Sequence, residues 1–346
     1  MRPGLRLALA IGVASLVVAP AALARGTCGG AVGSEWPAPL PGWYWDWAEW
    51  QADRSAGPRP GAAPRPVPHW AWRRLAVQRG AAREPAQLPL GGRDVLPRHR
   101  VVAYFGAPQA AALGALGIGS PADAARRLEG EARRYRRFGR PVLPAFELLA
   151  TVASAGAGED GKYRFRQPDG VICRYLKAAK RAGALLVLDI QPGRASFMDE
   201  VRRLGPYLRD RHVGLALDPE WSMDPDEVPG QVIGDTDAAT VNRVSAYLAG
   251  IVTRYRLPEK LLIVHQFEPS MIRNRGRLTR RPGVSLTINA DGFGTQLAKV
   301  AKYDLLTGPG DRFFHGFKLF YEEDTGLMSP SAVLRLRPPP DVIVYE

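Results

Sequence analysis

The feature that most constrains the fold is the alternation, from residue 100 onward, of short apolar runs with amphipathic segments. The apolar runs have the length of β-strands and cover residues 100–105, 141–147, 184–190, 213–218, 261–266, 284–289, 313–320 and 341–345. Apolar residues at helical spacing predict helices over residues 121–138, 171–181, 197–211, 236–255, 270–280, 294–303 and 330–336. Eight strands alternating with helices over about 245 residues are typical of one architecture. We therefore predict an α/β fold, a (β/α)8 barrel of the TIM type, over residues 99–346.

An open, doubly wound sheet is the alternative arrangement of alternating strands and helices. Such a sheet normally carries a glycine-rich phosphate-binding loop after its first strand. Here the first run is followed by Gly106-Ala107-Pro108, which lacks the glycine spacing of that loop. This difference favours the barrel.

The first 24 residues have the features of a secretory signal peptide. Arg2 and Arg6 precede an apolar run over residues 7–18, which is too short to span a bilayer. The small residues of Ala22-Leu23-Ala24 mark a cleavage site, so we expect the mature chain to begin at Arg25 and to carry no lipid. The protein is therefore predicted to be secreted, extracellular or associated with the cell wall, with no integral membrane segment after signal cleavage.

Residues 25–98 differ from the barrel segment by their richness in proline, glycine and tryptophan. Seven of the eight tryptophans lie here: Trp36, Trp43, Trp45, Trp47, Trp50, Trp70 and Trp72. Because aromatic rings bury large apolar areas, we predict that this extension packs on the barrel, at the flank where no helix follows the eighth strand. The alternative is a platform of exposed tryptophans, centred on residues 43–47, that stacks on sugar rings.

The formal net charge of +13 gives an indication of the partners. Lysine supplies only 7 of the 47 basic residues, and this preference for arginine, together with abundant alanine, glycine and proline, is typical of a high-GC genome. The arginines are therefore weak evidence for nucleic-acid binding, and no nucleic-acid partner is predicted. Outside the cell, a basic surface would concentrate the protein on anionic cell-wall polymers.

The sequence contains two cysteines, Cys28 and Cys173. An oxidising compartment would permit a bridge between them, and the equal alternative for Cys173 is a small buried thiol on the helix at residues 171–181. The cysteines and the five histidines show no recurring ligand spacing, so no metal site and no cofactor are predicted.

Two carboxylates one residue apart, Asp218 and Glu220, stand at the end of the fourth apolar run. Alternate residues of a strand face the same side, so we expect both to project together from the end of the strand. Gly214 and Ala216, in phase behind them, suit the crowded interior of a closed barrel. The pair is therefore predicted to point into the mouth of the barrel, where barrel enzymes carry their chemistry.

Polar residues also stand at the ends of the other runs. These further candidates are Tyr104, Glu147, Asp189, Gln191, His265, Gln266, Asn289, Asp291, Lys318, Tyr321 and Tyr345. Such a mouth suits a glycoside, because glycosidic cleavage needs a protonated acid and a second carboxylate. We predict Glu220 as the acid, with Asp218 raising its pKa. The partner carboxylate is expected among Asp189, Asp291 and Glu147. The remaining candidates, with Trp221 beside the acid, are predicted to bind a polysaccharide or another glycan.

Asp218-Pro219-Glu220 resembles the Asp-x-Glu of the barrel muramidases and, less closely, the end of the signature of chitinase-type glycoside hydrolases. In both families the glutamate is the acid, a role that falls here on Glu220. Several longer blocks resemble exported barrel proteins of high-GC Gram-positive bacteria: residues 183–193, 215–221, 261–267, 291–294 and 316–321. The resemblance implies export and a barrel fold. The sequence thus predicts a secreted, glycoside-hydrolase-like barrel that acts on a cell-envelope or environmental polysaccharide.

Two other functions remain alternatives. A non-catalytic carbohydrate-binding or wall-associated barrel would bind glycans without turnover, and its carboxylates would lie too far apart to cooperate. A phosphodiesterase-type barrel would need paired histidines or a calcium cage at the mouth. His265 and His315 are the one pair that the sequence offers, and His315 is expected at the opposite end of its strand.

Overall fold

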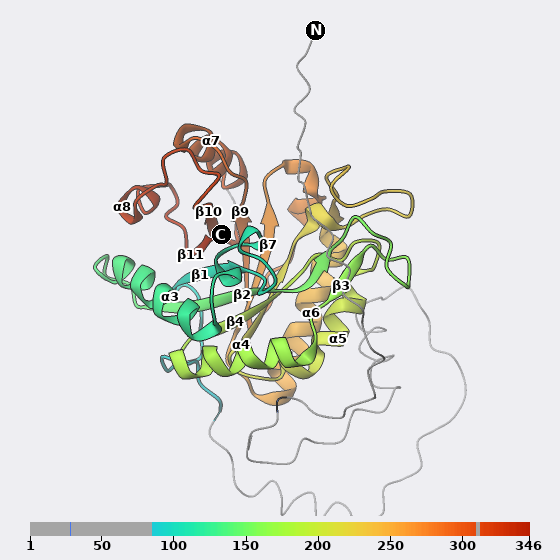
Figure 1. Ribbon diagram of the computed structural model, residues 1–346. Helices are drawn as coiled ribbons and strands as arrows, with labels where there is room; N and C mark the ends of the chain where they lie inside the picture. Colours follow the sequence, from blue (N-terminus) through green and yellow to red (C-terminus); the bar gives the residue numbers. More distant parts are fainter. Residues whose placement is uncertain (1–27, 29–84, 309–311) are drawn as a thin grey trace, which may run out of the picture.

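The computed structural model describes Cys28 and residues 85–308 and 312–346 (Figure 1). Within these residues, one sheet contains eight parallel strands: β1 (Arg100–Gly106), β2 (Val142–Ala153), β4 (Leu185–Ile190), β5 (Val213–Leu217), β7 (Lys260–Gln266), β9 (Val284–Ala290), β10 (Phe314–Leu319) and β11 (Val342–Tyr345). Each strand pairs with the next in this order, and β1 pairs with both β2 and β11, which closes the barrel. A short strand, β3 (Arg164–Arg166), adds to β2 in the antiparallel sense. The predicted TIM-type barrel is confirmed, and each of its eight strands overlaps a predicted run.

Helices lie outside the strands (Figure 1). They are α3 (Pro121–Arg136), α4 (Asp169–Ala182), α5 (Phe197–Leu208), α6 (Ala238–Tyr255), α7 (Gln296–Leu306) and α8 (Pro330–Val333). Polar caps help to fix where they begin. Ser120 and Asp123 form a reciprocal capping box at α3, and the Ser196 hydroxyl accepts the backbone N–H of Asp199 at α5. Each of these helices overlaps a predicted one.

Residues 270–280 do not form the helix that the periodicity predicts. They lie in a series of short elements: η4 (Pro269–Met271), β8 (Ile272–Arg273) and η5 (Arg275–Arg277). Asn274 has a φ of 55°, a left-handed conformation that a right-handed helix cannot contain. β8 instead pairs in parallel with β6 (Thr236–Asp237), so α6 begins at Ala238 rather than at residue 236. Pairing between two loops that are distant in sequence therefore overrides the local helical pattern.

Strand side chains alternate between two apolar cores. Inward residues such as Val101 and Ile263 fill the barrel, whereas outward residues such as Val102 pack under the helices. The interior is crowded: at Gly214 a Cβ atom would lie 2.9 Å from the carbonyl oxygen of Leu261. This alternation decides which residue at each strand end faces the mouth.

Residues 85–98 close the end of the barrel at which the strands begin. Leu88, Val95 and Leu96 are each at most 3% exposed, and they join the inward-facing side chains in the interior core. The chain then enters β1 directly. This short segment therefore supplies the apolar floor of the barrel.

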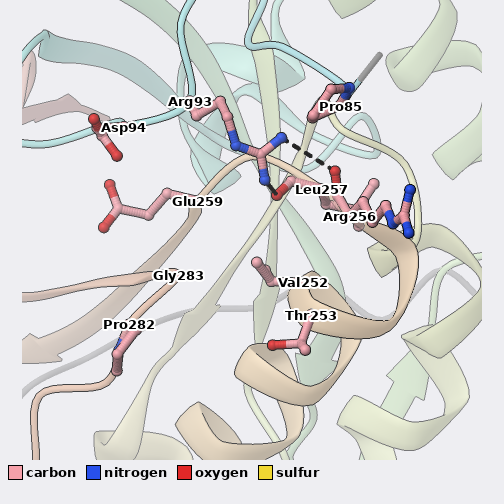
Figure 2. Close-up of a pocket in the computed structure, with 10 residues that line it drawn as sticks. All are labelled: Pro85, Arg93, Asp94, Val252, Thr253, Arg256, Leu257, Glu259, Pro282 and Gly283. Atoms are coloured by element: carbon pink, nitrogen blue, oxygen red, sulfur yellow. Dashed lines mark hydrogen bonds between the residues drawn. The ribbon is translucent and has the colours of Figure 1, made fainter. Parts of the chain in front are cut away.

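A cavity of about 510 Å3 lies at this floor (Figure 2). On its wall the Arg93 guanidinium donates to the carbonyl oxygens of Arg256 at 3.2 Å and Leu257 at 2.6 Å. The Glu259 carboxylate accepts the backbone N–H of Val95 at 2.7 Å. These charged groups tie the floor segment to the loop before β7.

Helix α3 packs on β1 and β2 and reaches β11 through one tyrosine pair. The fully buried Tyr345 places its hydroxyl 2.6 Å from that of Tyr135 on α3. The strap predicted for this flank falls on residues 36–72, which are outside the described part of the chain, as are the alternative tryptophan platform and the signal peptide predicted over residues 1–24.

Cys28 and Cys173 form a disulfide, with Cα atoms 5.2 Å apart. Of the two alternatives for Cys173, the structure therefore shows the bridge rather than a free buried thiol. Among the described helices, none is both long enough and apolar enough to cross a membrane.

Candidate active site

The inward positions at the strand ends converge on a buried group of charged and polar side chains. We call this group the central cluster; it contains Glu147, Asp189, Asp218, His265, Asn289, Asp291 and Lys318. Its members come from or directly follow β2, β4, β5, β7, β9 and β10, and all are between 0% and 5% exposed. Gly316 makes room for it, because a Cβ there would lie 2.2 Å from Asn289 Oδ1. The structure thus brings together seven of the predicted site residues.

His265 is the centre of the hydrogen bonding. Its Nε2 lies 2.9 Å from Glu147 Oε1, and its Nδ1 lies 2.9 Å from Asp291 Oδ2. Asn289 Nδ2 is 3.2 Å from the same Nδ1, and the ring of Phe105 packs edge-on at 6.1 Å. Burial by itself would lower the pKa of His265, but the carboxylates of Glu147 and Asp291 outweigh burial and raise the pKa well above its usual value.

Lys318 is the second cation of the cluster. Its Nζ lies 2.7 Å from Glu346 Oε2, 3.3 Å from Asp291 Oδ2 and 3.7 Å from the centre of the Phe105 ring. Burial acts to raise the pKa of Asp291, yet Lys318 and then His265 hold that pKa below its usual range. Asp291 Oδ1 also accepts the N–H of Gly292 at 2.6 Å. Asp291 is therefore a well-stabilised carboxylate.

Asp218 and Glu220 do not share a strand face, contrary to the prediction from their spacing. β5 ends at Leu217, and Pro219 begins a 3-10 turn, η3 (Pro219–Trp221), because its fixed φ and missing N–H suit the start of a helical turn. Asp218 stays in the interior at 2% exposure, where Gln191 Nε2 donates to its Oδ2 at 3.1 Å. Glu220 lies on the turn above it and is partly exposed.

The charge of Asp218 nevertheless acts on Glu220. Burial, followed by the charges of Asp218 and Asp291, raises the pKa of Glu220 well above its usual value. Burial also raises the pKa of Asp218 itself. The expected pKa effect is thus present although the expected strand geometry is absent.

Asp189 differs from its neighbours in receiving no hydrogen bond from any described residue. It is 0% exposed, and within the described chain no hydrogen-bond donor reaches either of its oxygens. Its Oδ2 lies 3.9 Å from His265 Nε2. Burial and then the charge of Asp218 raise the pKa of Asp189 well above its usual value. Glu147 Oε2 and Asp218 Oδ1 are likewise buried without a described donor.

Two sets of side chains in the cluster have the composition of a metal site. Glu147, Asp189 and His265 each place one ligand atom within 4.8 Å of the others, and so do Asp218, His265 and Asp291. The sequence prediction of no metal site rested on spacing along the chain, which does not detect ligands contributed by separate strands.

Three predicted binding residues lie outside the cluster because they occupy outward positions of their strands. The Gln266 amide donates to the carbonyl oxygen of Glu268 at 3.1 Å and so holds the loop after β7. Tyr104 and Tyr345 pack in the outer core. Tyr321, which is 41% exposed, donates to the Tyr104 hydroxyl at 3.3 Å.

Sequence reasoning missed Glu346 and Phe105, which both contact Lys318. Each lies in the inward phase of its strand. For Glu346 the signal was present: it follows Val342 and Val344 at spacings of two, and both of these valines belong to the interior core.

No family model matches this sequence, and neither does any curated protein. A solved structure of D-allulose 3-epimerase from Methylomonas sp. is similar to the chain with a TM-score of 0.25 and 14% identity, over 72% of this chain and 84% of that chain. A similarity of this size carries no argument about the site. The chemistry must therefore be argued from the central cluster itself.

Proposed function

We propose that this barrel is a secreted hydrolase that cleaves glycosidic bonds of a cell-envelope or environmental polysaccharide by carboxylate acid/base catalysis. The observation that carries the proposal is the place of Glu220, a partly exposed carboxyl at the edge of a cluster that is otherwise at most 5% exposed. Burial and the charge of Asp218 raise its pKa well above the usual value, which favours the protonated form. A protonated carboxyl in reach of solvent is the group that a departing glycosidic oxygen requires.

Asp291 is the carboxylate that we assign as the partner of Glu220. It is bonded to His265, Lys318 and the N–H of Gly292, and these donors favour its anionic form. A fixed carboxylate of this kind can stabilise the positive charge of an oxocarbenium-like transition state. One oxygen of Asp218 lies within 4.8 Å of one oxygen of Asp291, and the charges of both carboxylates contribute to the raised pKa of Glu220.

The surroundings of the mouth support binding of a glycan. Phe293, in the loop after β9, is 55% exposed, and Trp221, next to Glu220, is partly exposed. Exposed aromatic rings offer apolar faces on which sugar rings can stack. A cavity of about 420 Å3 lies between the first turns of α5 and α6. Because Arg202 and Arg243 line it, this cavity suits the anionic groups of a wall polymer.

Secretion is part of the proposal. The disulfide between Cys28 and Cys173 supports it, because such bonds persist in oxidising compartments outside the cytosol.

A non-catalytic carbohydrate-binding or wall-associated barrel is the second candidate. The observation in its favour is the low exposure of the central cluster, where Glu147, Asp189 and His265 are each 0% exposed. The phosphodiesterase alternative has no such support. His315 lies near the start of β10 and His265 near the end of β7, so these two histidines are at opposite ends of the barrel.

The proposal is tested by replacing Glu220 with glutamine. Peptidoglycan, arabinogalactan-like polymers, chitin and β-glucans are first screened for cleavage at pH 5 to 8. On the cleaved substrate, Glu220→Gln should lower kcat by about 10²- to 10⁴-fold, because an amide cannot donate the catalytic proton. The melting temperature and the glycan affinity should stay unchanged.

Glu322→Gln is the matched control, since Glu322 is an exposed glutamate in the loop that follows β10. It should cleave at the rate of the unmodified protein. If Glu220→Gln retains full activity, Glu220 is not the acid. If the unmodified protein binds a glycan but cleaves none of the polymers, the hydrolase proposal fails and the binding protein takes its place.

A further inference from the structure

We propose that Glu147, Asp189 and His265 bind one divalent transition-metal cation, of the Mn2+ or Zn2+ type, at the centre of the barrel. This inference goes beyond the proposed hydrolysis and does not depend on it. One imidazole nitrogen and two carboxylates form a mixed nitrogen and oxygen donor set, which suits these metals better than Ca2+ or Mg2+.

The three donors are arranged around a common point. One ligand atom of each lies within 4.8 Å of the other two. His265 Nε2 is 2.9 Å from Glu147 Oε1 and 3.9 Å from Asp189 Oδ2. Metal–nitrogen and metal–oxygen bonds of about 2.0–2.2 Å place neighbouring ligand atoms roughly 3 to 3.5 Å apart. Small side-chain adjustments therefore suffice to receive an ion.

His265 is already oriented as a ligand. The Asp291 carboxylate lies 2.9 Å from Nδ1 and holds a proton on that nitrogen. A cation would therefore displace the Nε2 proton, which His265 shares with Glu147 at 2.9 Å, and Nε2 would coordinate it on the side of Glu147 and Asp189. Asp291 is itself held by Lys318 at 3.3 Å. A carboxylate behind the histidine fixes the tautomer and the ring orientation, as is usual for metal-bound histidines.

Asp189 supplies an independent observation that points to a ligand. It is fully buried, its Oδ2 faces His265 Nε2, and no donor in the described chain reaches either oxygen. Glu147 Oε2 is also buried without a described donor. Buried carboxylates are normally paired, hydrogen-bonded or bound to a metal. A cation would satisfy both side chains at once.

The second set of candidate ligands, Asp218, His265 and Asp291, fits less well. Asp291 already forms an ion pair with Lys318 and a hydrogen bond with His265 Nδ1, and Asp218 accepts a hydrogen bond from the Gln191 amide. Three of the four oxygens of Asp218 and Asp291 are thus engaged by donors in the described chain, whereas three of the four oxygens of Glu147 and Asp189 are not. The site is therefore assigned to the carboxylates of Glu147 and Asp189.

Metal binding is measured on the full secreted chain, first stripped with EDTA and then titrated with Mn2+ and with Zn2+ in a calorimeter. We expect one ion per chain. Asp189→Asn and Glu147→Gln should each weaken binding by more than about 100-fold, because the loss even of a group behind the ligands costs 10- to 100-fold. Asp235→Asn, in an exposed pair with Arg273, is the control and should bind as the unmodified protein does.

Anomalous diffraction from a Mn2+-soaked crystal locates the ion and should show a peak in contact with His265 Nε2. The inference is overturned if neither metal binds at millimolar concentration, or if Asp189→Asn and Glu147→Gln both keep full affinity. It is also overturned if Asp218→Asn abolishes binding while Asp189→Asn does not, since the ion would then occupy the second set. Circular dichroism confirms that each variant folds. Hydrolysis is not used as a readout, so failure of metal binding would not contradict the hydrolase proposal, and failure of hydrolysis would not contradict metal binding.

Discussion

The two ends of the barrel both bury charged side chains, but they satisfy them in different ways. At the floor, Arg93 and Lys260 donate to backbone carbonyl oxygens, and Glu259 accepts backbone N–H groups. At the mouth, the charged groups of the central cluster contact mainly one another, and both oxygens of Asp189 lack a donor in the described chain.

The difference teaches which charges serve the fold and which serve chemistry. A charged side chain that is hydrogen-bonded to the backbone of another segment holds that segment in place. Its hydrogen-bonding capacity is then used by the fold and is not available to a ligand. Charges that face one another with acceptors left over are costly to bury and are available to a proton, a cation or a substrate. On this criterion the floor is structural and the mouth is functional, in agreement with the general placement of chemistry in such barrels.

The largest expected effect concerns Lys260 at the floor. It is 1% exposed, its Nζ donates to Val213 O at 2.7 Å, and burial lowers its pKa to about 7. Between pH 7 and about 10 the unfolded chain holds a proton that folded Lys260 has lost, so raising the pH favours the folded state. Relative to Lys260→Met, the free energy of unfolding should therefore rise by about 4 kcal/mol across that range.

The measurement is urea denaturation of both proteins from pH 6 to pH 10. The carbonyl oxygens that lose their donor in Lys260→Met destabilise the folded state equally at every pH. They therefore do not change how the difference in free energy of unfolding varies with pH. Lys177→Met, on the exposed side of α4, is the control and should show no pH-dependent difference. A flat difference for Lys260→Met as well would mean that the buried amine keeps its proton up to pH 10, held as a cation by its carbonyl acceptors.

The next effect concerns Glu259, whose Oε2 accepts the N–H groups of Val95 at 2.7 Å and Leu96 at 3.3 Å. Glu259→Leu leaves both buried N–H groups without an acceptor and should lower the free energy of unfolding by about 2 kcal/mol. Glu259→Gln keeps an acceptor oxygen and should lose less than half as much. Chemical denaturation at pH 7 distinguishes the two. Equal losses would show that the charge, rather than the hydrogen bonds, holds the floor segment.

Much of the fold and part of the mouth follow from sequence periodicity. The eight apolar runs place the strands, and the end of each run locates a candidate such as Glu147 or Asp189. Choosing between adjacent residues is harder, because a shift of one position moves a side chain to the other face of the sheet. Gln266 and His265 show this: only the second points inward, and the run that contains them is apolar on both faces.

Other features depend on contacts that no local pattern encodes. The loop at residues 270–280 pairs with the loop before α6, and that pairing replaces a predicted helix. Pro219 turns the chain after Asp218 and so moves Glu220 off the strand. The ion pair of Lys318 with Glu346 joins two neighbouring strands, so its partners are known only when the barrel is closed.

The smallest expected effect compares one aspartate from each end. Asp341, at the floor, is paired with Arg140 at 2.8 Å and accepts the N–H of His315 at 3.3 Å, whereas Asp189 has no described donor. In EDTA, Asp341→Asn should lower the free energy of unfolding by about 1 kcal/mol, because it removes an ionic partner from Arg140. Asp189→Asn should instead raise it by about 1 kcal/mol, because it replaces an unpartnered buried acid by a neutral amide. Chemical denaturation at pH 7 measures both changes in the free energy of unfolding.

Adding Mn2+ should then reverse the order of stability of Asp189→Asn and the unmodified protein, since a cation bound to the folded state alone stabilises only the chain that retains its ligand. If Asp189→Asn is destabilised in EDTA as Asp341→Asn is, Asp189 is a satisfied structural group and the contrast between the two ends of the barrel fails.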